Sequence, residues 1–198
     1  MGSGPRSRRR YPRGNLVSGD RLTHLDEHGR AHMVNVGEKA MTHRVCVARA
    51  EVEMARETLD RISGGDMPKG DVLATARLAG IQAAKRTSDW IPLCHPLPID
   101  SVSVTLAAAP VGHDGSLARL DIEASVETHW RTGVEMEALT AVTAAALSIY
   151  DMCKAIDRGM RVCNVRLVRK SGGKSGDWSR PDEPPMASGA GSSDGAKV

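Results

Sequence analysis

The 198-residue chain has no phenylalanine, and aromatic residues make up only 3% of it. Its core therefore has to be built from Val, Leu, Ile, Ala and Met. So few aromatic side chains also leave no row of stacking platforms of the kind that single-strand nucleic-acid binders use. The length and the hydrophobic content of 40% favour one globular domain with a sizeable core.

Long apolar runs and paired cysteines are missing as well. No segment reaches the roughly 18 apolar residues that suggest a membrane span. No apolar stretch follows the N-terminal arginines, which argues against a secretory signal, although an Arg-rich, acid-poor start leaves an organelle address open. Scattered single cysteines are typical of reduced thiols in a cytosolic protein, so we expect a cytoplasmic protein with no membrane contact. The four, none in a C-x-x-C pair, are Cys46, Cys94, Cys153 and Cys163.

Positive charge is concentrated at the N-terminus. Residues 1–21 hold six arginines and one acid, a charge of +5, so residues 22–198 carry about −2 of the total of +3. A folded part without a basic surplus argues against a nucleic-acid partner. Both ends are rich in Gly, Ser and Pro, so we expect disordered tails at 1–20 and 179–198 around one domain at 21–178.

Hydrophobic periodicity predicts an α+β fold. Helices are expected near 54–63, 71–87 and 133–156, and Asp71 is expected to cap the second. The order strand, helix, strand, strand, helix, strand is that of a ferredoxin-like split βαβ fold, a four-stranded antiparallel sheet with helices on one face. The strands are expected at 44–52, 99–108, 117–128 and 160–169.

Residues 117–128 show the clearest alternation in the chain. Leu120, Ile122, Ala124 and Val126 point to one face of the expected strand. The opposite face carries a polar row, which we expect to be partly solvated or to lie at a subunit contact: Arg119, Asp121, Glu123, Ser125 and Glu127.

The glycine-rich stretch 170–177 resembles a P-loop only superficially. A P-loop needs glycine five residues before the Gly of its Gly-Lys-Ser, and Val168 stands there. The loop also leads into Pro181 and not into a helix whose N-terminus could face phosphate. Two lysines, Lys170 and Lys174, could still contact phosphate, but a flexible exit loop explains the composition equally well.

Other candidate groups are ambiguous on the residues alone. Cys94 and His95 lie in a rigid loop with prolines, but zinc sites usually draw several Cys or His at short spacings. Glu135 and Glu137 at a helix start suit the helix dipole. Asp151 and Lys154, three residues apart on a helix, fit an ordinary surface ion pair. The histidines at 24, 28 and 32 share a helical spacing that the glycine at position 29 argues against, so we expect no metal site.

Taken together, several long blocks resemble the cyclic pyranopterin monophosphate synthase family of molybdenum cofactor biosynthesis. The resemblance runs from residue 22 to about 178, and blocks in the same order are far more specific than any single motif. The blocks are LTH at 22–24, G-x-A-x-M-V at 29–34, KGDVLATARLAGIQAAKRT at 69–87, IPLCHPL at 91–97, TGVEMEALTA at 132–141, IYDMCKAI at 149–156 and KSGGKSGD at 170–177.

The resemblance implies a lyase that converts a 3′,8-cyclised dihydro-GTP into cyclic pyranopterin monophosphate and diphosphate. It implies a ferredoxin-like fold, a homohexamer arranged as a trimer of dimers with sites between subunits, and no cofactor or protein-bound metal. Asp151 and Lys154 are then the expected catalytic residues. The expected substrate-binding residues are Lys69, Lys85, Leu93, Cys94, His95, Glu135, Met136, Glu137 and Lys170.

Two other functions remain as alternatives. One is a metal-dependent nucleotide hydrolase that uses His95, Glu135 and Glu137. The other is a non-enzymatic regulatory module that binds a nucleotide, in which Lys69, Asp151 and Lys154 would have no chemical role.

Overall fold

The computed structural model describes residues 28–111 and 117–186; the expected tail at 1–20 and the histidine at position 24 lie outside these ranges. The chain divides into two compact units, Met1–Val34 and Asn35–Val198. In the first unit, the described residues 28–34 hold a turn and one isolated β-bridge residue, Ala31. The helices and strands described below belong to the second unit.

A single antiparallel sheet organises the second unit, in the order β2-β3-β1-β4-β5. Its first four strands have the order and connections of a ferredoxin-like fold, so the α+β prediction is confirmed. A short fifth strand, which we did not predict, pairs with the edge of β4. The strands are β1 (Thr42–Ala55), β2 (Ser101–Val111), β3 (Leu117–Trp130), β4 (Arg161–Ser171) and β5 (Trp178–Ser179).

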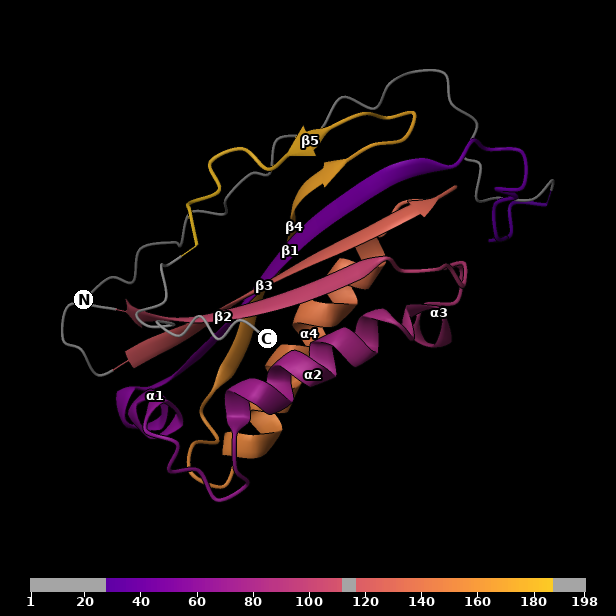
Figure 1. Ribbon diagram of the computed structural model, residues 1–198. Helices are drawn as coiled ribbons and strands as arrows, with labels where there is room; N and C mark the ends of the chain where they lie inside the picture. The colour runs from indigo at the N-terminus through magenta and orange to yellow at the C-terminus, as the bar shows by residue number, and fades with distance from the viewer. Residues whose placement is uncertain (1–27, 112–116, 187–198) are drawn as a thin grey trace, which may run out of the picture. The chain divides into compact units, whose positions relative to one another are not determined.

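The two long helices, α2 (Val72–Ala84) and α4 (Glu135–Cys153), lie side by side on one face of the sheet (Figure 1). Asp71 caps α2 as predicted, because its carboxylate accepts a hydrogen bond of 2.8 Å from the Ala74 amide. The helix predicted over 71–87 is interrupted after Ala84, and the short α3 (Thr87–Trp90) follows. The remaining helix, α1 (Arg56–Ser63), follows β1 directly.

The core lies between these helices and the sheet, and the predicted aliphatic composition is confirmed. The side chains of Leu120, Ile122, Ala124 and Val126 on β3 are all buried, as the alternation indicates. Met54, Ile122 and Ile149 are the largest fully buried side chains. Methionine and isoleucine thus fill the volume that phenylalanine occupies in other cores.

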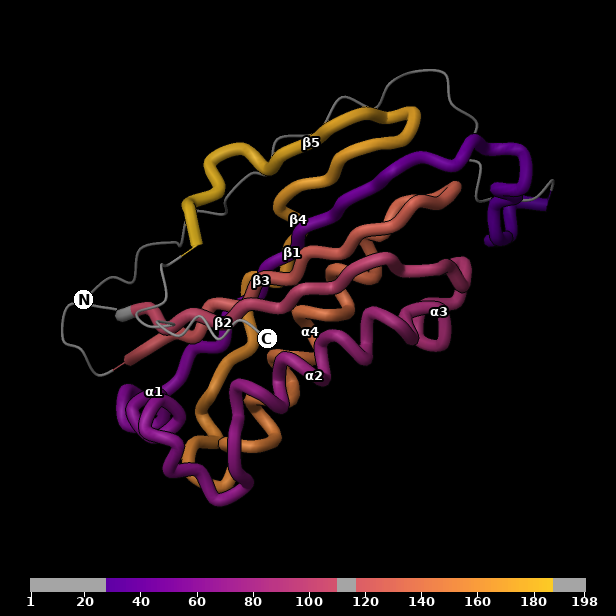
Figure 2. Tube along the Cα trace, in the orientation of Figure 1, coloured from indigo at the N-terminus to yellow at the C-terminus, as the bar shows by residue number. Residues whose placement is uncertain are grey.

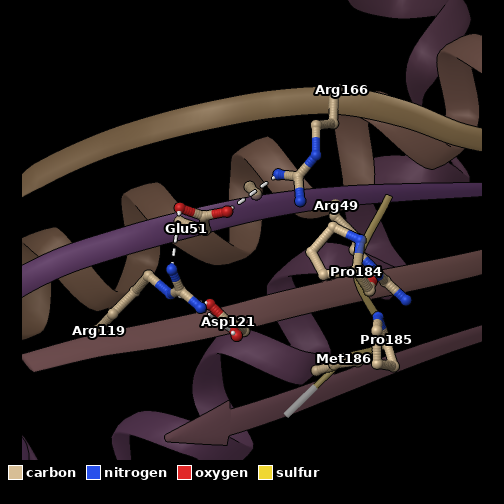
Figure 3. A pocket seen from close by; sticks show the side chains of 9 residues that line it. Arg49, Glu51, Arg119, Asp121, Arg166, Pro184, Pro185 and Met186 are labelled. Carbon is tan, nitrogen blue, oxygen red and sulfur yellow. Dashed lines mark hydrogen bonds and ion pairs between the residues drawn. The ribbon is translucent and has the colours of Figure 1, made fainter. Parts of the chain in front are cut away.

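Part of the polar face of the sheet is covered by the chain's own C-terminal residues. Figure 3 shows Pro184, Pro185 and Met186 beside the arginines and carboxylates of this face. These residues belong to the segment that we expected to be a disordered tail from 179; the structure describes it as far as residue 186. The polar row of β3 is therefore shielded in part by this chain alone.

In the described part of the chain, no helix has both the length and the apolar character needed to cross a membrane.

Candidate active site

Three of the expected site residues meet at the C-terminal end of α4. Asp151 lies in the last turn of this helix, and Lys154 is its C-cap residue. The Nζ atom of Lys69, from the loop before α2, lies 2.8 Å from Oδ2 of Asp151, and Nζ of Lys154 lies 2.6 Å from Oδ1. Lys69 also donates to the Asp151 carbonyl at 3.0 Å. The fold thus brings together residues 82 positions apart, and all three are exposed.

The two lysines determine the charge state of this group. Hydrogen bonds from Lys154 first and Lys69 second lower the pKa of Asp151 to about 2. At neutral pH the group is therefore one fixed carboxylate between two ammonium ions. The cluster carries a net positive charge and is open to solvent, which suits a polyanionic ligand.

A second group surrounds the first turn of α4. Glu137 is buried, with 4% of the residue exposed, whereas Glu135 and Met136 are half-buried. Burial, with a smaller contribution from the charge of Glu135, raises the pKa of Glu137 to about 7. This carboxyl group can therefore both hold and release a proton near neutral pH.

A small cavity of about 70 Å³ joins Glu137 to residues from α2 and the proline-rich loop. Lys85 at the end of α2 lines it, as does His95 from the loop. Cys94, next to His95, is half-buried, and its thiol pKa is raised by burial and by the charge of Glu137. Leu93 in the same loop is exposed. This part of the site is mixed in character, with charged and hydroxyl groups beside a few apolar side chains.

Lys170 extends the second group from the end of β4. Its Nζ atom lies 3.6 Å from Oε1 of Glu135 and donates to Oγ of Ser175 at 2.6 Å. Ser175 belongs to the glycine-rich loop, so Lys170 connects this loop to the start of α4. The sequence left open whether the loop is only an exit from the fold, and these contacts favour a structured turn.

The two groups are far apart within one chain. Helix α4 is continuous from Glu135 to Cys153, so Glu135 and Asp151 are separated by 16 helical residues. At about 1.5 Å per residue, their Cα atoms are roughly 24 Å apart. The structure thus assembles the expected residues into two groups and does not unite them around one small ligand.

Next to Asp151, a groove of about 450 Å³ runs between α2 and α4. Arg86, Gln82 and Ser148 line it, none of which we predicted as site residues. The sequence positions of two of these residues could have marked them as site candidates. Arg86 directly follows Lys85, and Ser148 lies one turn before Asp151 on the same helix, so it shares that face.

Within residues 28–111 and 117–186, no group of three or more His, Cys, Asp or Glu side chains has the geometry to hold a metal ion.

Comparison with known proteins identifies the family. The MoaC family model matches residues 33–173. This chain belongs to the MoaC family. A relative from Roseiflexus sp. (strain RS-1), named cyclic pyranopterin monophosphate synthase, is 62% identical over 157 residues, which are 79% of this chain and 96% of the relative. Relatives of the same name from Thermomicrobium roseum and Cereibacter sphaeroides are 56% and 57% identical, over 82% and 78% of this chain and 95% and 94% of their own lengths.

Proposed function

We propose that this chain is a cyclic pyranopterin monophosphate synthase, a lyase of molybdenum cofactor biosynthesis. Its substrate is (8S)-3′,8-cyclo-7,8-dihydroguanosine 5′-triphosphate, and its products are cyclic pyranopterin monophosphate and diphosphate. The observation that carries the proposal is the high identity to synthases of this name over nearly their whole length.

The exposed lysine group supports this reaction. A triphosphate has to be held, and its diphosphate has to leave as the cyclic phosphate forms. Lys69 and Lys154 supply two ammonium groups within hydrogen-bonding distance of Asp151, so they can act as point charges for the phosphates without a P-loop.

Substrate binding also changes the acidity of Asp151. Phosphate oxygens compete with the Asp151 carboxylate for the two lysines. Each hydrogen bond that a lysine transfers to phosphate removes a cause of the lowered pKa, so the pKa of Asp151 rises towards its ordinary value. Asp151 then becomes a better base, which fits its proposed role as the general acid/base of the rearrangement.

The second group is proposed to hold the purine-derived part of the substrate. Leu93, Cys94 and His95 would supply backbone and side-chain contacts from a loop that prolines stiffen, and Met136 and Glu137 would add contacts from the first turn of α4, where Glu137 lines the same cavity as His95. Lys85 and Lys170 add positive charge at the same end. Glu135 holds Lys170, since its carboxylate lies 3.6 Å from Nζ.

Because the two groups are roughly 24 Å apart on one rigid helix, we propose that each active site is completed by a second copy of the chain. A two-fold axis brings the start of one α4 to the end of the other and creates two identical sites. The α2–α4 face suits this contact, since its groove begins at Asp151 and the exposed Leu78, Trp90 and Leu147 lie on or next to these helices. We further propose that three such dimers form the hexamer, in the cytoplasm.

The test is mass spectrometry of the products after incubation with the cyclised GTP substrate. We expect cyclic pyranopterin monophosphate and diphosphate in equal amounts, without added metal cofactor. If the purified protein carries stoichiometric zinc or manganese and loses its activity on chelation, a metal-dependent nucleotide hydrolase explains it better. Binding of the substrate without turnover would instead indicate a regulatory module.

A further inference from the structure

The C-terminal segment Trp178–Met186, called the latch segment below, follows the glycine-rich loop and returns along β4. It lies beyond residues 33–173, the range that the family model matches. Figure 2 shows β4 and β5 as two arms of a hairpin. Trp178 pairs with Lys170 and Ser179 with Arg169, and Arg180 adds hydrogen bonds of 2.8 Å to the carbonyls of Val168 and Leu167.

At the far end of the latch segment, two arginines form a receptor for a carboxylate. Arg49 on β1 and Arg166 on β4 are direct cross-strand partners, and their side chains are only 14% and 19% exposed. Like charges placed opposite each other destabilise a sheet. The pair therefore needs negative charge close by to be stable in this shielded position.

Glu183 of the latch segment supplies that charge. Its carboxylate accepts hydrogen bonds from Nε and Nη2 of Arg166 at 2.9 and 2.5 Å and from Nη1 of Arg49 at 3.0 Å. The side chain is 9% exposed, and Arg166 and then Arg49 lower its pKa. A paired, two-oxygen contact between a carboxylate and guanidinium groups is among the strongest hydrogen-bonding arrangements in proteins.

The two arginines also contact carboxylates on the strands. Arg49 lies 2.7 Å from Glu123 on β3, and Arg166 lies 3.1 Å from Glu51 on β1. These contacts join strands that are already paired along their length. Glu183, in contrast, joins the latch segment to the sheet through its ion pairs with both arginines.

Closure of the hairpin fixes the glycine-rich loop, which spans residues 171–177. The Gly172 amide donates to Oδ1 of Asp177 at 3.2 Å across the loop, and Lys170 at its base contacts Ser175. Trp178, the direct partner of Lys170, is the first residue of the latch segment. The contacts that hold this segment on β4 therefore fix the C-terminal side of the loop and one side of Lys170, which pairs with Cys46 of β1 on its other side.

We propose that Glu183 is a positioning residue: by binding the Arg49–Arg166 pair, it locks the β4–β5 hairpin and so presents Lys170 and the glycine-rich loop to the diphosphate part of the substrate. That the loop binds diphosphate, the functional step, rests on the proposed function. That Glu183 locks the hairpin, the mechanical step, does not. A loop that binds a leaving diphosphate has to keep its lysine and amide groups in one geometry, because disorder at this point weakens binding.

The mechanical step is tested by amide hydrogen exchange of residues 172–179 in the full-length chain. Glu183→Gln keeps the shape of the side chain and removes its charge. We expect exchange of these amides to accelerate about tenfold or more, since the loss of a charge-assisted hydrogen bond favours local opening. Glu123→Gln is the matched control, because it removes a carboxylate from the same Arg49 without touching the latch segment.

The functional step is tested with inorganic diphosphate as the ligand. We expect Glu183→Gln to bind it about tenfold more weakly than the wild type and Glu123→Gln to bind it equally well. With the full substrate, Glu183→Gln should raise KM more than it lowers kcat. If the wild type does not convert the cyclised GTP, the proposed function fails. The exchange experiment still decides whether Glu183 locks the latch segment on β4.

Unchanged exchange in Glu183→Gln overturns the proposal, and so does equal acceleration in both variants. Circular dichroism checks that each variant is folded. If Glu183→Gln does not fold, Glu183→Asp takes its place, because the shorter carboxylate keeps the charge and loses part of the contact. The proposal that Glu183 locks the hairpin is then refuted if the folded Glu183→Asp chain shows both wild-type exchange and wild-type diphosphate binding.

Discussion

Asp151 and Glu137 lie near opposite ends of one helix and differ in pKa by several units. Asp151 is exposed and bound by two lysines, which lower its pKa to about 2. Glu137 is buried, and burial raises its pKa to about 7. The two environments therefore separate a carboxylate that is fixed as an anion in the free protein from a carboxyl group that titrates near neutral pH.

Replacing Asp151 tests whether its carboxylate takes part in turnover. In Asp151→Asn the shape is kept and the proton-transfer group is lost, so we expect kcat to fall by about 100-fold or more. Steady-state kinetics with the cyclised substrate measure this. The melting temperature and the oligomeric state should stay at wild-type values, because the side chain is exposed.

Asp60→Asn is the control for this substitution. Asp60 is also an exposed helical aspartate with a basic partner, since it lies 2.9 Å from Nε of Arg56. Its loss should leave kcat unchanged. A wild-type rate in Asp151→Asn would mean that this residue is only a surface ion-pair partner.

Glu137 should make the stability of the protein depend on pH. Because the folded-state pKa of about 7 lies above the ordinary 4.5, the folded chain binds more protons than the unfolded chain between these values. The contribution of protonated Glu137 to the free energy of unfolding is therefore fully present below about pH 4.5. It is lost as the pH rises through 7, and the loss amounts to roughly 3 kcal/mol.

Urea unfolding at pH 5 and pH 8 measures this effect. In Glu137→Gln the group no longer titrates, so the difference in unfolding free energy between the two pH values should change by about 2–3 kcal/mol relative to the wild type. Glu57→Gln, an exposed acid in the first turn of α1, should leave that difference unchanged. An identical pH dependence in Glu137→Gln and the wild type would contradict a raised pKa.

The elements of the fold were readable from the sequence to the extent that local pattern determines them. The alternation on β3, the Asp71 cap and the helical stretch that became α4 each follow from local sequence pattern. The latch segment could not be predicted, because its three prolines and its position in a Pro-, Gly- and Ser-rich C-terminal stretch resemble a solvated tail. Its Glu183 contacts Arg49, more than 130 residues away, and no local pattern shows that contact.

The glycine-rich loop also contains a contact that only the structure shows. Gly172 and Gly176 both have positive φ, 85° and 64°. A Cβ atom at Gly172 would overlap the carbonyl oxygen of His43, whereas one at Gly176 would meet open space. The two glycines thus share a left-handed backbone conformation, and they differ in whether a Cβ atom would collide with a neighbouring strand.

We therefore expect Gly172→Ala to be the more damaging of two similar substitutions. Gly176→Ala should cost about 1 kcal/mol, the price of left-handed backbone for a residue with a Cβ. Gly172→Ala should cost at least about 2 kcal/mol and should weaken substrate binding, because the loop has to move away from β1. Urea unfolding and KM measure the two effects, and equal losses in both variants would show that the contact with β1 is unimportant.

At the scale of the whole molecule, the expected site residues form two groups near opposite ends of α4, which the proposed function treats as two half-sites. The residues proposed for both half-sites could be chosen from the sequence, through their types and the family resemblance. The fold then explains why Lys69 contacts Asp151, 82 positions away. Their assembly could not be read from one chain, because a continuous helix keeps the two halves apart. A second copy has to supply the missing half if both act on one substrate.

Mixing two inactive variants decides whether the site is shared. Glu137→Ala damages one half-site and Asp151→Ala the other, so we expect each variant alone to have little activity. In a mixed two-fold dimer, one site then carries both substitutions and the other carries neither. With random pairing of equal amounts, half of the dimers are mixed and each has one intact site, so roughly a quarter of the wild-type activity should return.

Subunit exchange has to be verified, because a tightly associated assembly would keep the variants apart. Different affinity tags on the two variants allow mixed assemblies to be purified after joint refolding, and native mass spectrometry counts their composition. Mixed assemblies of Asp151→Ala with Lys154→Ala are the control: both substitutions fall in the same half-site, so every site keeps one defect and no activity should return. Recovery in the first mixture and none in the second places the two half-sites on different chains. Verified exchange without recovery in either mixture would place the reaction within one chain and leave Glu135 and Glu137 as residues of a helix start.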